Sequence, residues 1–167
     1  MKEAELAFLL LMVDLQRCGL DLDRFAEEPH DLPNLVRVDR KGRFFTTSKV
    51  ERVAQLGEIP SPYLSGDLDP FFDGRLLPII QPNRGCPVAC TFCTEGQSYW
   101  NKVNFKPEEV VRGEIEYIAE RYARIPGSRS DLLIADSNFG MYATDMPTCR
   151  AIAETQRKYK YPKYINV

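Results

Sequence analysis

The chain has 167 residues, a formal net charge of −2 and a hydrophobic content of 44%. This is about the length of one ordinary domain, with enough apolar residues to build a core. Domains that bind nucleic acid usually carry a net positive charge, which this chain lacks, so we expect no nucleic-acid partner. The apolar run at residues 6–13 is too short to span a bilayer and lacks the flanks of a signal peptide, so we expect no membrane association.

A helix and a hairpin are predicted at the start of the chain. Residues 3–18 are dense in leucine, and Gly19 is a plausible helix stop. Residues 35–38 and 44–47 flank the polar turn Asp39-Arg40-Lys41-Gly42, a pattern typical of a short hairpin.

The organisation of the chain changes after this hairpin. Residues 48–74 are interrupted by proline and glycine and show no clear periodicity, which predicts a linker. We therefore divide the chain into a leader helix and hairpin (1–56), a linker (57–75) and an α/β domain (76–167).

Three short apolar runs in the last region fit the buried strands of a parallel sheet: 76–80, 132–135 and 164–167. Two helices separate them, and strand–helix–strand crossovers place neighbouring strands parallel in the α/β class. The loops after the first two strands then fall on one edge of the sheet. In parallel α/β barrels that edge carries the active site.

The two helices have recognisable starts. The first opens at Pro107-Glu108-Glu109 and ends at Pro126-Gly127, and Asp145 is expected to cap the second. The faces expected to be buried are Val111, Ile115, Ile118, Ala119 and Tyr122 in the first helix, and Cys149, Ile152 and Ala153 in the second.

Three cysteines, Cys86, Cys90 and Cys93, form the pattern C-x3-C-x2-C at the start of one of these loops. Gly85 and Pro87 argue against a helix that would bury all three thiols on one face. Three cysteines in one loop also cannot pair off as disulfides. Metal binding is the remaining interpretation.

The number of ligands favours iron over zinc. A structural zinc site is closed by four ligands, whereas His30, Cys18 and Cys149 are isolated and distant from the motif. We expect Cys18 and His30 to be structural. Thiolates are the ligands of iron–sulfur clusters, and three of them leave one iron open to bind a substrate. Cysteines kept reduced for a cluster also predict a cytoplasmic protein.

The cysteine motif, with Phe92 before its last cysteine, resembles the signature of the radical S-adenosylmethionine (radical SAM) superfamily. The preceding segments, Ile59-Pro60-Ser61-Pro62-Tyr63-Leu64-Ser65-Gly66 and Leu77-Pro78-Ile79-Ile80-Gln81-Pro82-Asn83-Arg84, resemble the branch whose barrel follows a cobalamin-binding domain. Ile134-Ala135-Asp136-Ser137-Asn138-Phe139-Gly140 resembles the second-strand segment of that branch. The resemblance covers about residues 57–167.

The resemblance implies the N-terminal part of a (βα) radical SAM partial barrel with a [4Fe-4S] cluster held by Cys86, Cys90 and Cys93. The open iron would chelate the amino and carboxylate groups of S-adenosylmethionine (SAM). One electron would then cleave SAM reductively to methionine and a 5'-deoxyadenosyl radical, as in a radical SAM enzyme. The implied partners are a reductant such as flavodoxin or ferredoxin, and a substrate that is a small molecule or a peptide.

The same resemblance implies which side chains bind SAM. Phe92 would lie against the adenine side. Asp136, Ser137 and Asn138 would lie near the methionyl end, where the best-known family members carry Gly-Gly-Glu. Glu95 is a weaker candidate for the same site.

We expect the chain to be a fragment. An eight-stranded barrel needs about 200 residues or more, whereas the region from residue 76 holds about 90. Met1-Lys2-Glu3-Ala4-Glu5-Leu6-Ala7-Phe8 resembles the closing part of the family's cobalamin-binding domain. The Asp-x-His-x-x-Gly segment that carries the lower cobalamin ligand is absent from the sequence. Cobalamin is therefore expected only in a longer parent protein.

Two other functions remain compatible with the three cysteines. The first is an iron–sulfur electron carrier, in which Cys149 or an external ligand completes the cluster. The second is an interaction module stabilised by zinc.

Overall fold

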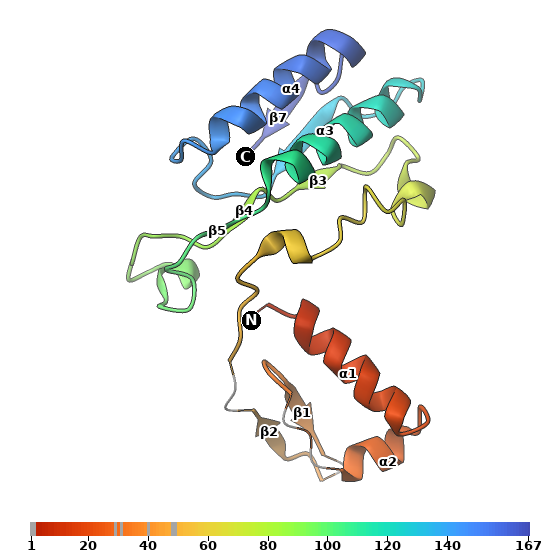
Figure 1. The fold of residues 1–167 in the computed structure, drawn as a ribbon, viewed down its shortest axis with the longest axis vertical. Helices are drawn as coiled ribbons and strands as arrows, with labels where there is room; N and C mark the ends of the chain where they lie inside the picture. The colour runs from red at the N-terminus through yellow and green to blue at the C-terminus, as the bar shows by residue number, and fades with distance from the viewer. Residues whose placement is uncertain (1–2, 29, 31, 40, 48–49) are drawn as a thin grey trace. The chain divides into compact units, whose positions relative to one another are not determined.

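The computed structural model divides the chain into two compact units, Met1–Ala54 and Gln55–Val167 (Figure 1). None of the helices in the part of the chain that the structure describes is both long enough and apolar enough to cross a membrane. The described residues are 3–28, 30, 32–39, 41–47 and 50–167.

The first unit contains the predicted helix and hairpin. Helix α1 spans Glu5–Arg17, and it ends before Gly19, whose φ of +70° is incompatible with a continuing helix. Strands β1 (Val36–Val38) and β2 (Phe44–Thr46) pair antiparallel, which confirms the hairpin. The short helix α2 (Leu22–Glu27) was not predicted. Arg40 of the predicted turn lies outside the described residues.

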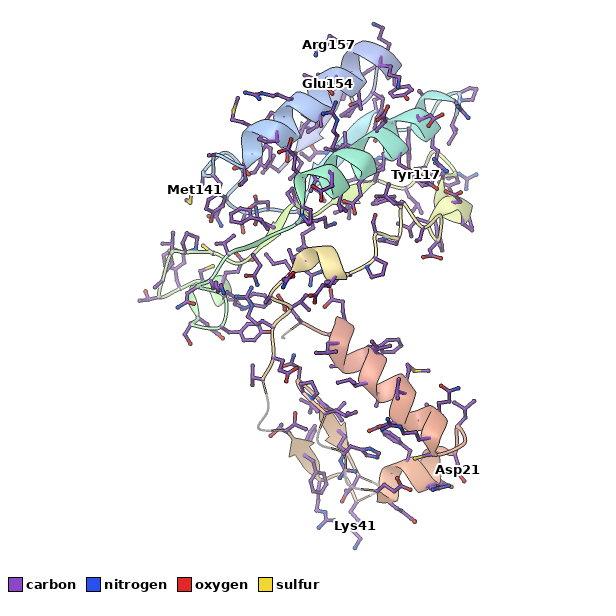
Figure 2. The ribbon with its side chains drawn as sticks, viewed as in Figure 1. Asp21, Lys41, Tyr117, Met141, Glu154 and Arg157 are labelled. Carbon is purple, nitrogen blue, oxygen red and sulfur yellow. The ribbon has the colours of Figure 1, made fainter. Side chains whose placement is uncertain are left out.

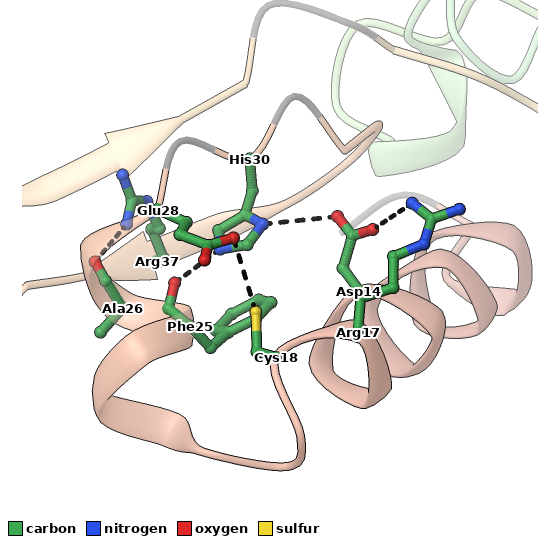
Figure 3. Close-up of polar contacts among 8 residues, drawn as sticks. All are labelled: Asp14, Arg17, Cys18, Phe25, Ala26, Glu28, His30 and Arg37. Atoms are coloured by element: carbon green, nitrogen blue, oxygen red, sulfur yellow. Dashed lines mark hydrogen bonds and ion pairs between the residues drawn. The ribbon is translucent and has the colours of Figure 1, made fainter.

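Cys18 and His30 are both engaged in polar contacts within this unit (Figure 3). The Cys18 Sγ lies 3.6 Å from Oε2 of Glu28, and the His30 Nδ1 lies 3.4 Å from Oδ2 of Asp14. The His30 ring stacks on Phe25 with centroids 3.8 Å apart. Burial and the neighbouring Glu28 carboxylate raise the pKa of the Cys18 thiol, which favours its protonated form.

A parallel sheet of three strands organises the second unit. Its strands are β3 (Ile79–Ile80), β6 (Asp131–Ile134) and β7 (Tyr164–Asn166), in the order β3-β6-β7. Ile79 lies opposite Leu133. All three predicted strands and their parallel pairing are confirmed, and the unit is of the α/β class. The described strands do not close into a barrel.

Helices α3 (Glu108–Ala123) and α4 (Asp145–Tyr159) pack against one face of this sheet (Figure 1). Ion pairs join the outer sides of the two helices, and one of them links Arg112 on α3 to Glu154 on α4 at 2.5 Å. Glu154 is labelled in Figure 2. The predicted face of α3 is confirmed, because its five apolar positions are all buried: Val111, Ile115, Ile118, Ala119 and Tyr122.

The buried face of α4 differs from the prediction. Ile152 is buried as expected and Ala153 is half-buried, but Cys149 is exposed. Thr148 and Thr155 take the inward positions instead, spaced at three to four residues from Ile152. Cys149 follows Thr148 and is therefore turned about 100° around the helix, away from the sheet.

Residues 57–75, which we expect to be a linker, are tied to the rest of the second unit. The Tyr63 hydroxyl donates to the Ile79 carbonyl at 3.0 Å and accepts from the Ile79 N–H at 3.1 Å. The Asp69 carboxylate accepts from Tyr117 and Arg121 on α3. The segment contains a single-turn 3-10 helix at Asp69–Phe71, and another, Leu56–Glu58, precedes it. The domain boundaries themselves stay a prediction.

A two-stranded ladder that was not predicted closes the cysteine loop. Strand β4 (Asn83–Arg84) pairs antiparallel with β5 (Asn104–Phe105). Residues 85–103 therefore form a loop whose two ends are held together by this ladder. Strands of two residues are too short to show a sequence period. The loop includes one 3-10 turn, Thr94–Gly96.

Gly85 lets the chain leave this ladder. Its φ is +117°, and an added Cβ would lie 2.6 Å from the Lys102 carbonyl oxygen and 2.7 Å from the Trp100 carbonyl oxygen. Gly96 is similarly constrained, because an added Cβ would overlap the Cys90 carbonyl oxygen. Two glycines therefore allow the close backbone contacts that shape the cysteine loop.

The two neighbouring isoleucines of β3 give a matched test of the core. Ile80 is 1% exposed against the helices, whereas Ile79 is 47% exposed. We expect Ile80→Ala to lower the free energy of unfolding by about 2–5 kcal/mol and Ile79→Ala by only about 1 kcal/mol. Urea unfolding measures both, and equal losses would contradict the assignment of the two faces.

The second unit should lose stability at alkaline pH. Burial, with the neighbouring Tyr122 and Asp131, raises the pKa of the Tyr161 hydroxyl. The folded protein therefore holds a proton that the unfolded chain releases above about pH 10. The stabilisation is complete below that pH and is lost as pH rises. We expect the urea midpoint to fall from pH 9 to 11, less steeply in Tyr161→Phe. An identical slope in the variant would show that Tyr161 is not responsible.

Substitution of Gly85 should lower the free energy of unfolding by more than the strain of its positive φ alone would cost. We expect Gly85→Ala to cost about 3–5 kcal/mol, because left-handed strain adds to the overlap with two carbonyl oxygens. Gly127 is the control, since its φ is +72° but an added Cβ would meet nothing within 4 Å. Gly127→Ala should cost about 1–2 kcal/mol in the same unfolding measurement. Similar costs for both would remove the role given to the carbonyl contacts.

Candidate functional site

The three cysteines of the motif lie on the loop between β4 and β5, with different exposures. The Cys86 N–H donates to the Trp100 carbonyl at 2.9 Å, and the Cys93 N–H donates to the Cys90 carbonyl at 3.2 Å. Cys86 is buried at the base of the loop, Cys90 is half-buried and Cys93 is exposed. All three are free thiols.

The chemistry of these donors fits an iron–sulfur cluster, although the thiols are not gathered around a common point. Across the described ranges, no three His, Cys, Asp or Glu side chains are placed so that they could hold a metal ion. Three free thiols on one loop match the ligand type of an iron–sulfur cluster. A closed zinc site would require a fourth ligand.

Asp136 begins the second loop of the site, directly after β6. Its side chain is buried, and two donors hold its carboxylate. The Asn83 Nδ2 donates to Oδ2 at 2.6 Å, and the Asn138 N–H donates to Oδ1 at 2.9 Å. The carboxylate is thereby fixed in position at the carboxyl edge of the sheet.

Side-chain contacts bring the two loops together. The Cys86 Sγ lies 3.8 Å from Oδ1 of Asn138. The Ser137 hydroxyl donates to Oε2 of Glu95 at 2.8 Å, so Glu95 also lies at this junction. Phe92 is 92% exposed, and the structure does not bring it to the second loop.

Asp145 has a different role from the helix cap that we predicted. Thr144 occupies the N-cap position of α4, without a side-chain hydrogen bond, and Asp145 is the first helical residue. The Asp145 carboxylate instead accepts from the N–H groups of Gly140 and Tyr142 at 2.8 and 3.0 Å. It folds the preceding loop rather than capping the helix, since Asp145 is already a helical residue and its carboxylate binds N–H groups that precede the helix.

Two residues of the site, Asn83 and Tyr142, were not predicted from the sequence. Asn83 is 3% exposed, and it contacts a residue 53 positions away. No local pattern reports such a pairing. Its position in the sequence could have indicated a role in the site, because Asn83 lies three residues before Cys86 and follows a predicted strand.

Tyr142 is held inside the second loop with its hydroxyl buried. Its ring meets the Phe105 ring edge-on, with centroids 5.3 Å apart. The hydroxyl has no hydrogen-bond partner among the described residues. Burial raises the pKa of this hydroxyl, and the negative forms of Cys86 and Asp136 raise it further, so the Tyr142 hydroxyl is neutral.

Comparison with known proteins identifies relatives of this chain, although no family model matches it. It is 33% identical over 123 residues to the 2-(S-pantetheinyl)-carbapenam-3-carboxylate methyltransferase of Streptantibioticus cattleyicolor, covering 70% of this chain and 17% of that protein. It is 30% identical over 125 residues to the cobalamin-dependent radical SAM methyltransferase TokK of Streptomyces tokunonensis, covering 71% and 18%. The chain thus spans less than one fifth of these relatives.

A solved structure supports the same fold. The cobalamin-dependent SAM radical enzyme OxsB, with aqua-cobalamin and SAM bound, matches 92% of this chain and 20% of its own, with a TM-score of 0.60 and 19% identity. A second OxsB structure, with aqua-cobalamin bound, matches with the same TM-score. Together with the sequence matches, this makes the chain a relative of the cobalamin-dependent radical SAM methyltransferases; the cysteine motif and its flanks predicted the superfamily and its cobalamin-associated branch, but not methyl transfer.

Proposed function

We propose that this chain is the cluster-binding and cofactor-binding part of a radical SAM enzyme. The observation that carries the proposal is the 3.8 Å contact between Cys86 and Asn138, where the cysteine loop meets the loop after β6. The motif cysteine at this contact is buried, and a second, acidic loop lies against it. A cluster and a zwitterionic cofactor need these two kinds of group side by side.

In this proposal, Cys86, Cys90 and Cys93 hold a [4Fe-4S] cluster. When bound, the cluster supplies the electron that cleaves SAM reductively. The loop positions the cluster, with Cys86 on the protein side and Cys93 toward solvent. Burial on one side limits access of water to the reacting groups.

The second loop would bind the methionyl end of SAM. The Asp136 carboxylate, held by Asn83, attracts the ammonium group through a charge-assisted hydrogen bond. Ser137 and Asn138 lie beside it as further polar contacts. Phe92, which is exposed, is available to stack against the adenine.

The activity of the whole protein is a further part of the proposal. The matched relatives are methyltransferases, so methyl transfer to a small molecule is the reaction that we favour. Cobalamin would bind to a longer parent protein, because the Asp-x-His-x-x-Gly segment is absent here. Flavodoxin or ferredoxin as reductant, and a cytoplasmic location, stay predictions.

Anaerobic reconstitution tests the proposal directly. We expect the chain to take up about four irons with sulfide and, after reduction, to convert SAM to 5'-deoxyadenosine and methionine. Mass spectrometry measures both products. The variants Cys86→Ser, Cys90→Ser and Cys93→Ser should each reduce 5'-deoxyadenosine formation to background, because each removes a cluster ligand. Cys149→Ser is the matched control, since Cys149 is exposed on α4.

Other outcomes would identify the competing functions. A chain that binds iron and sulfide but does not cleave SAM would favour an electron carrier. A colourless chain that holds one zinc would favour the zinc-stabilised interaction module and contradict both iron-based functions.

A further inference from the structure

One carboxylate lies among the apolar side chains on the buried face of α3. Glu114 is 1% exposed, and the buried residues around it on the helix are Val111, Ile115 and Ile118. Burial of a carboxylate is costly, even where a charged partner compensates for the lost water. A leucine would fill the same position without that cost. The stability of the core alone therefore does not account for Glu114.

The partner of this carboxylate is Lys106, the residue that follows β5. Its Nζ donates to both carboxylate oxygens of Glu114, at 2.9 and 3.1 Å. The two side chains are 17% and 2% exposed, so the ion pair is shielded from solvent. Charge-assisted hydrogen bonds impose a direction, which apolar contacts do not. The ion pair thus fixes the end of β5 at one place on α3.

Lys106 is also bonded to the chain segment that leads into the cysteine loop. Its N–H donates to the Pro82 carbonyl at 2.8 Å, directly before β4. The next residue, Asn83, donates to the Asp136 carboxylate at 2.6 Å. A continuous series of contacts therefore runs from Glu114 in the core, through Lys106 and the ladder, to Asp136 at the carboxyl edge of the sheet.

We propose that Lys106 and Glu114 are positioning residues for the cofactor site. Their ion pair fixes the base of the cysteine loop and, through Asn83, the Asp136 carboxylate that binds SAM. This inference rests on the proposed function. Neither Lys106 nor Glu114 needs to touch SAM, so loss of the pair should weaken SAM binding even where the core stays filled.

The double variant Lys106→Met, Glu114→Leu tests the inference, because it replaces both charges with apolar side chains of similar size. Such a replacement often leaves stability unchanged or raises it, whereas a single substitution would leave one buried charge unpaired. We expect a urea midpoint equal to or above that of the parent chain. The reconstituted variant should nevertheless bind SAM about tenfold more weakly in an equilibrium titration.

The matched control is Arg112→Met, Glu154→Leu, which removes an exposed ion pair that also begins on α3. It should bind SAM as the parent chain does. Parent-like SAM affinity in the Lys106–Glu114 double variant would overturn the inference, and so would an equal loss of affinity in the control. A clearly lower urea midpoint in the Lys106–Glu114 double variant would assign the pair to core stability and overturn the inference as well.

Hydrogen exchange in the chain without its cluster separates positioning of the loop from general loosening of the core. The Cys86 N–H, bonded to the Trp100 carbonyl at the base of the loop, should exchange roughly tenfold faster in the double variant. The Ile118 N–H within α3 should exchange as it does in the parent chain. Weaker SAM binding with unchanged exchange at Cys86 would show that the pair does not hold the loop, and would overturn the inference.

The route through Asn83 has its own test. In the Asn83→Ala chain, the Lys106–Glu114 double variant should cause no further loss of SAM affinity, because the pair acts through Asn83. A further tenfold loss there would overturn the inference. In all these contrary results the parent chain still binds SAM, so the proposed function survives them. Failure of the reconstituted parent chain to bind SAM would instead overturn the proposed function, and the inference with it.

Discussion

The hydrogen bond between Asn83 and Asp136 joins the two loops that make up the candidate site. It is 2.6 Å long and links residues 53 positions apart, each less than a tenth exposed. Loss of either partner would leave a buried polar group unpaired, which costs more than loss of an exposed hydrogen bond. Since Asn83 lies on β4, this one contact holds the base of the cysteine loop against the loop after β6.

The parallel sheet makes this contact available. Strands β3 and β6 are neighbours, so their carboxyl ends lie together and the chain leaves both at the same edge. Buried faces of α3 and α4 hold the strands from one side. Gly85 then turns the chain out of β4, and the ladder to β5 returns it. The packing of the apolar helix faces on the sheet thus positions the two polar loops at its carboxyl edge.

The sequence predicted the elements whose pattern repeats and missed those that depend on distant contacts. The 3.6-residue period of α3 identified its buried face, including Ile115 and Ile118, and the cysteine spacing located the first loop. Strands β4 and β5 were missed because two residues show no period. Cys149 was misplaced because the register of α4 is set by packing on α3 and the sheet. Asn83 and Tyr142 depend on tertiary contacts that no local pattern reports.

The claim that the two loops form one site is tested most directly by a double-mutant cycle on SAM binding. The reconstituted chain, Asn83→Ala, Asp136→Ala and the double variant would be titrated with SAM. If Asn83 acts by holding Asp136, the double variant should bind SAM no more weakly than Asp136→Ala alone. Losses that add in the double variant, or an Asp136→Ala variant that binds as the parent does, would contradict the account.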